Sequence, residues 1–347
     1  MLVAYTSDHA LHDPQVEMER SAAQSPFEHG GRVEAIRTAL ATDQRFQFVD
    51  PPEWGNAPIT AVHDPGLVQF IATAWEEYQQ VFGPTREVVP DVFHLAGLRH
   101  GMEPGKEPPH IGGRLGWWCF ETTTPLVSGT FRAACRSVDT ALTATQAVLD
   151  GAHGSYGLCR PPGHHAARSL YGGYCFFNNA AIAAHHVSTT TGTKVAVLDV
   201  DYHHGNGTQQ IFYERDDVLY VSLHGDPARA YPYTVGYASE TGAGRGAGAN
   251  VNLPLPERLE DDGYLAALER ACDVIASFGA SLLVVSLGLD TFVSDPICDL
   301  SLSTEGFEAC GRAVGALGLP TVVLQEGGYD VEHLGENARR WLVGLVG

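Results

Sequence analysis

The sequence has 347 residues, of which 44% are hydrophobic and 18% charged, and its formal net charge is −20. This composition is typical of a globular protein with a sizeable core, and the length suits one large domain or two ordinary ones. The acidic balance makes nucleic acid a poor partner, because phosphate binding needs clustered lysine and arginine. The negative charge favours a cationic ligand through electrostatic steering. A simpler explanation for the same charge is that it keeps the protein soluble, and the two explanations account for it equally well.

The N-terminal stretch MLVAYTSDHALHDPQVEMER lacks the basic start and long apolar run of a signal peptide. No apolar run approaches the ~18 residues that a membrane span needs. The seven cysteines are scattered, odd in number and without a CxxC pair, which argues against a disulfide framework and against a thiolate zinc site. We therefore expect a cytoplasmic protein with reduced thiols and no membrane partner.

In chain order, the first segment without regular periodicity is 83–116, which is rich in glycine and proline. Loops of this length usually serve function or form an interface, and a flexible surface insertion is the alternative. A helix is predicted next, over 131–149, with Gly151 as its C-terminal stop. One stripe of this helix carries the apolar residues Phe131, Cys135, Val138, Leu142 and Leu149.

Apolar runs then predict four strands: KVAVLDVDYHH (194–204), VLYVSLHG (218–225), SLLVVSLGLD (281–290) and PTVVLQEGGY (320–329). Such near-continuous apolar strands are typical of a parallel sheet that is covered on both faces. Between the second and third runs, an amphipathic pattern predicts a helix with Asp261 and Asp262 as N-capping candidates and Gly279 as its stop. The alternation, without linker or internal repeat, predicts one α/β domain over residues 1–347 with a doubly wound sheet.

Each predicted strand ends in polar residues, and ligands of open parallel sheets bind at the carboxyl ends of strands. Asp201 and His203 lie two apart on an extended segment, so their side chains point to one side. With Asp290 from another strand end, they form a three-ligand divalent site with one open position, as in catalytic zinc. The ligand types also suit Fe(II) or Co(II). Helix capping by the carboxylates is the alternative explanation.

Several further side chains have matching roles around such a metal. Asp199 either orients a histidine or joins carbonyl oxygens and the Ser222 hydroxyl around a monovalent cation. Of the adjacent His164 and His165, one can act as general base, while the other supplies electrostatic help or a proton to the leaving amine. Asp199 or Asn206 would hold their far nitrogens. Tyr329, which follows two glycines, can donate to an oxyanion. Together these groups predict amide hydrolysis.

These stretches resemble the arginase/deacetylase superfamily, and more narrowly its zinc-dependent, histone-deacetylase-like amidohydrolases. The matching motifs run in family order over about residues 155–330: RPPGHHA, GGYCFFNNAA, VLDVDYHHGNGTQ, YVSLHGDP, SLGLDTFVSDP and EGGY. The resemblance implies the arginase/deacetylase fold, with a mostly parallel sheet of about eight strands and helices on both faces. It assigns zinc to Asp201, His203 and Asp290, proton transfer to His164 and His165, and the oxyanion donor to Tyr329.

Within that superfamily the chain is most similar to acetylpolyamine amidohydrolases. Three features carry this resemblance: the stretch HGDPARAYPYTVGYASETGAGRGAGAN, an SDH near the N-terminus and the 83–116 insertion. The resemblance implies removal of acetyl from a short cationic acetylamine, with release of acetate. It also implies a homodimer formed through the insertion, which narrows the active-site mouth.

The resemblance further implies two groups of binding residues and one structural ion. Tyr174, beside Gly173, and Tyr231 would form the walls of the substrate tunnel. Loop carboxylates would select the distal ammonium, and the candidates are Glu17, Glu19 and Glu121. A potassium ion would bind Asp199, the Ser222 hydroxyl and backbone oxygens of Asp201, His203 and Leu223. A second cation would lie near Phe212, Arg215 and Val218.

Two departures from the relatives stand out. Asn206 replaces an aspartate that many relatives have, and an amide stabilises an imidazolium less strongly, so His165 should be easier to deprotonate. Gly112 stands where an acid is expected in the insertion, and Glu121 is slightly displaced from that position.

Three alternative functions remain at this stage. An acetyl-lysine deacetylase acting on proteins or peptides would use the same chemistry on another substrate. A binuclear manganese ureohydrolase would need more bridging carboxylates and would leave the histidine pair and Tyr329 without a role. A non-catalytic binder of acetylated ligands would be indicated by loss of a ligand or of Tyr329, yet all are present.

Overall fold

The computed structural model describes residues 1–19 and 21–347. Its centre is an eight-stranded sheet in the order β4-β1-β5-β10-β9-β6-β7-β8, and every neighbouring pair is parallel. The strands in chain order are β1 (Leu2–Ala4), β4 (Gln47–Val49), β5 (Gly154–Gly157), β6 (Val195–Asp199), β7 (Val218–Gly225), β8 (Asn250–Leu255), β9 (Leu282–Leu287) and β10 (Thr321–Gln325). A separate antiparallel hairpin consists of β2 (Glu17–Glu19) and β3 (Ala22–Gln24).

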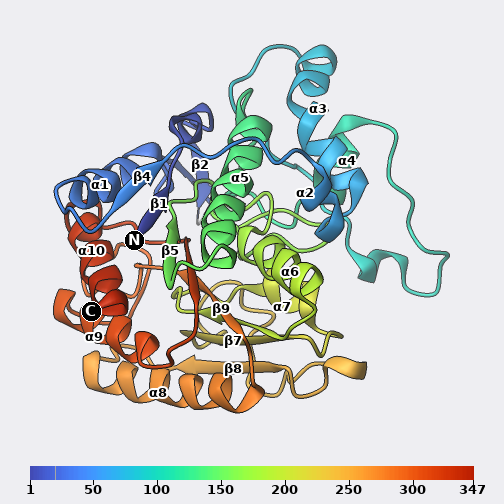
Figure 1. Ribbon diagram of the computed structural model, residues 1–347. Coiled ribbons are helices and arrows are strands. Elements are labelled where there is room, and N and C mark those ends of the chain that lie inside the picture. The colour runs from blue at the N-terminus through green and yellow to red at the C-terminus, as the bar shows by residue number, and fades with distance from the viewer. Residues whose placement is uncertain (20) are drawn as a thin grey trace.

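Helices cover both faces of this sheet (Figure 1). The helices are α1 (Gly30–Ala41), α2 (Ala57–Val62), α3 (Pro65–Phe82), α4 (Ile111–Trp118), α5 (Thr130–Leu149), α6 (Asn179–Thr191), α7 (Asn206–Phe212), α8 (Asp261–Phe278), α9 (Thr304–Gly315) and α10 (Val331–Val346). Short 3-10 turns are η1 (Ser7–Leu11), η2 (Ala96–Arg99) and η3 (Gly244–Gly246). Across the described residues, no helix has both the length and the apolarity that a membrane crossing requires.

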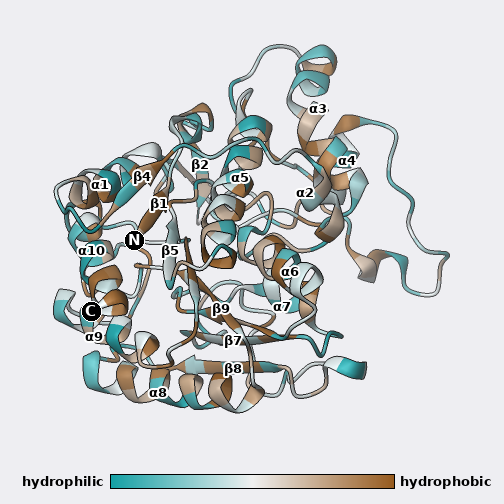
Figure 2. Cartoon of the chain, in the orientation of Figure 1, coloured by the Kyte–Doolittle hydropathy of each residue, from teal (hydrophilic) through white to brown (hydrophobic). Residues whose placement is uncertain are grey.

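Alternate residues of each central strand enter two separate cores. In β6, Val195 and Val197 pack with α2 to α6, whereas Ala196 and Leu198 pack with α1 and α8 to α10. This happens because successive side chains of a strand point to opposite faces, and it explains why the apolar runs of these strands are nearly continuous (Figure 2). The predicted doubly wound parallel sheet is confirmed.

The four strands predicted from apolar runs are β6, β7, β9 and β10. Four further strands were not predicted. The first two, β1 and β4, have three residues each, too few to show a periodic pattern. The third, β5, reads GSYG, and the fourth, β8, contains Pro254 and lies at the sheet edge, where a missing backbone donor is tolerated.

Two local expectations need correction. The 83–116 segment is not a continuous loop, because η2 lies inside it and α4 begins at Ile111. The buried side chains of Ile111, Leu115 and Trp118 anchor α4. The part of the 83–116 segment before α4 projects from the body of the molecule and is called the insertion arm below (Figure 1). At α8, the N-cap residue is Glu260, not Asp261 or Asp262. Asp261 instead accepts hydrogen bonds from the backbone and hydroxyl of Ser303, at the start of α9.

The order of the strands brings the chemically active loops together. The strands β5, β10, β9, β6 and β7 are consecutive neighbours in the sheet. Because all are parallel, the loops that follow them leave the same edge. Those loops contain the predicted histidine pair, Tyr329, Asp290, and the Asp201–His203 segment.

Candidate active site

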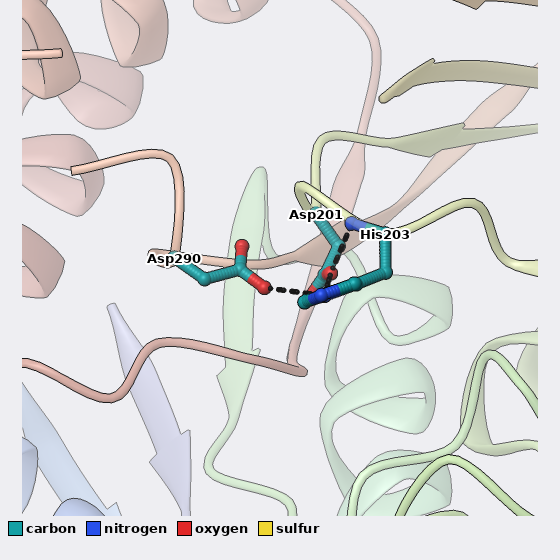
Figure 3. A group of neighbouring side chains, drawn as sticks. All are labelled: Asp201, His203 and Asp290. Carbon is teal, nitrogen blue, oxygen red and sulfur yellow. Dashed lines mark hydrogen bonds and ion pairs between the residues drawn. The ribbon is translucent and has the colours of Figure 1, made fainter. Parts of the chain in front are cut away.

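The three predicted metal ligands meet at the carboxyl ends of two adjacent strands. The Nδ1 atom of His203 lies 3.0 Å from Oδ2 of Asp290 and 3.3 Å from Oδ1 of Asp201. Candidate ligand atoms of the three residues all lie within 4.8 Å of one another. Asp201 and His203 follow β6 and Asp290 follows β9, and the side chains point toward one another (Figure 3).

Each carboxylate of this group is fixed by a backbone donor. Oδ2 of Asp201 accepts from the amide of Gly327 at 2.8 Å, and Oδ1 of Asp290 accepts from the amide of Tyr202 at 2.8 Å. Both aspartates are fully buried. Burial, with the charge of Asp201 beside it, raises the pKa of Asp290 above its usual range. A divalent cation would relieve the repulsion between two buried carboxylates at such short range, and one imidazole with two carboxylates is a donor set that fits a divalent metal.

The two adjacent histidines have different partners. Nδ1 of His164 lies 3.1 Å from Oδ2 of Asp199, and Nδ1 of His165 lies 2.7 Å from Oδ1 of Asn206. Burial by itself lowers the pKa of His164, but the carboxylates of Asp199 and Asp201 outweigh it and raise that pKa to about 10. Burial and the charges of His164 and His203 hold the pKa of His165 well below its usual range. His165 is therefore the neutral member of the pair.

Tyr329 is held by residues that sequence reasoning missed. Arg32 of α1 donates to the carbonyl oxygens of Gly328 and Glu326, both at 2.6 Å, and its guanidinium lies 4.6 Å from the centroid of the Tyr329 ring. Burial raises the pKa of Tyr329 well above its usual range, although the nearby Arg32 opposes this. The hydroxyl therefore stays protonated and can donate a hydrogen bond.

Arg32 belongs to a buried ionic cluster with Glu28 and Arg160. Oε1 of Glu28 accepts from Arg32 and from Arg160, each at 2.8 Å, and all three side chains are at most 2% exposed. Arg160 stands in the RPPGHHA motif, yet nothing in the sequence pairs it with Glu28, 132 positions earlier.

One cavity of about 400 Å³ joins these groups to the surface. His165, His203 and Tyr329 lie in its wall together with the predicted tunnel residues Gly173, Tyr174 and Tyr231. The rings of Tyr174 and Tyr329 are 6.0 Å apart, and the rings of His165 and Tyr231 are 4.9 Å apart. The lining residues also include Glu19, Thr123, Tyr202, Arg229, Ala230, Tyr233, Pro296, Ile297, Cys298 and Asp299.

Gly173 is required at its position for a steric reason. Its φ is +59°, and a Cβ there would collide with the ring of His165. Tyr174 follows with a φ of +66°, which is uncommon for a residue with a side chain. This turn presents Tyr174 to the cavity, and its amide donates to the Thr124 hydroxyl at 2.7 Å.

The three acidic candidates for substrate binding occupy different places. Glu19 lines the cavity. Glu121 accepts from the amide of Gly173 at 3.0 Å and from both hydroxyls of Thr123 and Thr124, so it supports the Tyr174 turn. Glu17 is 1% exposed and its carboxylate faces Tyr174, while burial raises its pKa. Neither Glu17 nor Glu121 is among the residues that line the cavity. Their direct contact with a substrate stays a prediction.

An ion pair in the cavity wall was also missed. Nε of Arg229 donates to Oδ2 of Asp299 at 2.8 Å, and Nη2 donates to the carbonyl of Leu255 at 2.9 Å. The pair joins the loop after β7 to the segment after Asp290. It neutralises the second acidic side chain of the cavity wall.

The residues predicted to hold potassium lie at the ends of β6 and β7, which are paired in the sheet. Asp199 is buried and also accepts from the Tyr220 hydroxyl at 2.9 Å, and the Ser222 hydroxyl lies 2.7 Å from Nδ1 of His224. Around the second predicted cation position, Arg215 pairs with Asp217 and lies 5.0 Å from the Phe212 ring centroid. Both cation sites stay predictions.

Comparison with known proteins gives one consistent family. A model of the histone deacetylase domain matches residues 26–345. Acetylpolyamine amidohydrolase 1 of Pseudomonas aeruginosa is 41% identical and is matched over 100% of this chain and 99% of its own. The acetylpolyamine amidohydrolase of Mycoplana ramosa is 39% identical over the whole of both chains. A crystal structure of the acetylpolyamine aminohydrolase from Burkholderia pseudomallei superposes with a TM-score of 0.93 at 39% identity, covering 99% of this chain and 98% of the other.

Proposed function

Because this chain belongs to the histone deacetylase family, we propose that it is a metal-dependent amidohydrolase that removes acetyl groups from acetylated polyamines. Water cleaves the C–N bond of the terminal acetamide, and the products are acetate and the free amine. Full-length relatives with 39% to 41% identity carry this activity in their names. The observation that carries the proposal is that His203, which meets Asp201 and Asp290 in one group, lines the same cavity as His165 and Tyr329.

Asp201, His203 and Asp290 would hold the metal, for which we propose Zn²⁺, with Fe²⁺ or Co²⁺ as alternatives for this donor set. When bound, the ion supplies Lewis-acid polarisation of the amide carbonyl and of the attacking water.

The two histidines have different roles: His165 transfers the proton, and His164 carries a fixed positive charge. Asn206 accepts from Nδ1–H of His165, so Nε2 carries the free lone pair, and His165 lines the cavity while neutral. His165 therefore takes the proton of the attacking water and holds it for the leaving amine. His164 keeps its charge against Asp199, which offsets part of the negative charge of the carboxylates.

The remaining residues orient the substrate. The Tyr329 hydroxyl donates to the carbonyl oxygen as negative charge develops on it. Tyr174 and Tyr231 contact the alkyl chain, and aromatic faces also tolerate a cation. Glu19, the carboxylate of the three candidates that lies in the cavity wall, attracts the distal ammonium.

We further propose that two copies of the chain associate through the 83–116 insertion. Its arm carries exposed apolar side chains, namely Val92, Leu95, Leu98 and Met102, and exposed clusters of this kind mark interaction surfaces. We also propose a structural potassium at Asp199, Asp201, His203, Ser222 and Leu223. A cytoplasmic location is supported by the seven cysteines, all of which are free.

The test compares turnover of N-acetylputrescine and N-acetylcadaverine with turnover of an acetyl-lysine peptide, alongside metal analysis. We expect about one divalent metal per chain, preference for the acetylated diamines, and loss of activity on metal chelation. Tyr329→Phe should retain the metal and lower kcat by about 10²- to 10³-fold. Preference for the peptide would favour an acetyl-lysine deacetylase. Two metal ions per chain would favour a ureohydrolase. Binding of the acetylated diamines without turnover would favour a non-catalytic binding protein.

A further inference from the structure

The loop that carries Tyr329 is held by three side chains from other segments, in addition to backbone hydrogen bonds with Leu287 and Leu289. Asp201 accepts from the amide of Gly327, and Arg32 donates to the carbonyl of Gly328. The amide of Tyr329 itself donates to Oδ2 of Asp295 at 2.7 Å. Gly328 has a φ of +118°, a conformation open to glycine, so its own backbone does little to restrict the loop.

Burial and local hydrogen bonds hold the Asp295 side chain in the orientation that this contact needs. It is 7% exposed, and its other carboxylate oxygen accepts from the amide of Ile297 at 3.1 Å, which closes an Asx turn. Its own amide donates to the carbonyl of Phe292 at 3.0 Å. Local bonds therefore fix the side chain, and the remaining oxygen faces Tyr329.

The position of Asp295 joins three parts of the site. It lies five residues after the metal-ligand candidate Asp290, and Pro296, Ile297 and Cys298 directly after it line the cavity. Asp295 itself is not among the lining residues. We therefore infer that any effect of Asp295 on catalysis passes through the residues that it holds.

We propose that Asp295 is a positioning residue that sets the place of the Tyr329 hydroxyl relative to the metal group and the cavity wall. This inference rests on the proposed function, because it assigns a consequence to the position of Tyr329 in amide hydrolysis. A displacement of about 1 Å in a catalytic group can cost about 10²-fold in rate. Asp295 thus controls kcat while it contacts neither the metal nor the substrate.

The test is a double-mutant cycle with Asp295→Asn and Tyr329→Phe, using N-acetylputrescine and an acetyl-lysine peptide as substrates. Asparagine can keep the Asx turn through its side-chain oxygen, but its NH₂ group then faces the amide of Tyr329. Because both groups are hydrogen-bond donors, the bond to Tyr329 is lost. We expect Asp295→Asn to lower kcat about 10- to 100-fold, with KM and metal content changed less than about twofold. In the Tyr329→Phe background, the same substitution should change kcat by less than about twofold, because the hydroxyl that it displaces is already absent.

Asp261→Asn is the matched control, since the Asp261 carboxylate also accepts a backbone amide, from Ser303, and also lies outside the cavity lining, but its partner is not in the Tyr329 loop. It should lower Tm without lowering kcat. Asp295→Glu, which keeps the charge and moves the oxygens, should reproduce the kcat defect.

Three results would overturn the inference while leaving the proposed function intact: equal defects with and without the Tyr329 hydroxyl, a fall in metal content that matches the loss of activity, or failure of both Asp295 variants to fold. Wild-type protein inactive on both substrates would overturn the proposed function, and the inference with it.

Discussion

At residue 206, an amide stands where a carboxylate would stabilise a charged histidine. Asn206 receives the Nδ1 hydrogen of His165 at 2.7 Å, and its own NH₂ donates to the His165 carbonyl at 3.3 Å. The second bond orients the amide, so its oxygen faces the ring. Asn206 therefore selects one tautomer of His165 without adding a negative charge, and the imidazole stays neutral.

Asn206→Asp should raise the pKa of His165, because a carboxylate stabilises the imidazolium form. A base must be deprotonated to work, so a raised pKa moves the acidic limb of the kcat/KM profile to higher pH. We expect this limb to lie at higher pH in the variant than in the wild type, in profiles that extend far enough into acid to include both limbs. Gln210→Glu adds the same charge at an exposed position of α7 and should leave the limb in place. An unmoved limb in Asn206→Asp would contradict this account.

At the scale of elements, the Glu28–Arg32–Arg160 cluster ties α1 to the loops after β5 and β10. Burial alone would raise the pKa of Glu28, but Arg160 and Arg32 outweigh it and lower that pKa to about 2. Because the folded-state pKa is depressed, the stabilisation is complete above about pH 4.5 and is lost as the pH falls toward 2. The size of this contribution is about 3 kcal/mol.

Glu28→Gln should therefore lower the free energy of unfolding at pH 7 by about 3 to 5 kcal/mol, since it leaves two buried guanidinium groups without their shared partner. Urea unfolding at pH 7 and pH 3.5 measures this loss. The difference between wild type and variant should shrink at the lower pH. Glu305→Gln, at an exposed position in α9, is the control. A difference that does not depend on pH would contradict the assigned role of the Glu28 charge.

The Arg229–Asp299 ion pair joins two loops in the wall of the cavity. While Arg229 is present, Asp299 is a poor partner for a substrate ammonium. Arg229→Gln should raise kcat/KM for N-acetylputrescine about 5- to 10-fold relative to a neutral N-alkylacetamide, since a freed carboxylate attracts a cation by about 1 kcal/mol. Arg245→Gln changes the net charge equally at an exposed position. An unchanged ratio of the two substrates would show that Asp299 does not reach the ammonium.

At the scale of the whole molecule, we propose that the insertion arm determines whether the chain forms a dimer. Leu98 is 74% exposed and Met102 62% exposed, which is unfavourable for a chain without a partner there. Leu98→Glu should convert a dimer to a monomer in sedimentation equilibrium and raise KM if the partner narrows the cavity mouth. Val293→Glu is the control, because Val293 is 60% exposed outside the insertion. A wild-type mass of one chain would contradict the proposed dimer.

The sequence by itself determined the parallel sheet and the residues expected around the metal. Strands β6, β7, β9 and β10 are apolar on both faces, and polar residues follow directly where each strand ends, so short-range patterns contain this information. Asp201, His203, Asp290, His164, His165 and Tyr329 were predicted because each lies within such a pattern. The short strands β1 and β4 were missed, since three residues show no periodicity.

Only the tertiary structure decided how those residues are supported and which carboxylates line the cavity. The bond from Arg32 to Gly328 spans 296 positions, and the bond from Tyr329 to Asp295 spans 34. Glu17, Glu19 and Glu121 are equivalent candidates in the sequence, but in the structure Glu17 is buried, Glu121 accepts from the amide of Gly173, and Glu19 is the one of the three that lines the cavity. The physical reason is that side-chain charge and hydrogen-bonding capacity are visible in a sequence, whereas the partner that uses them depends on how distant segments pack.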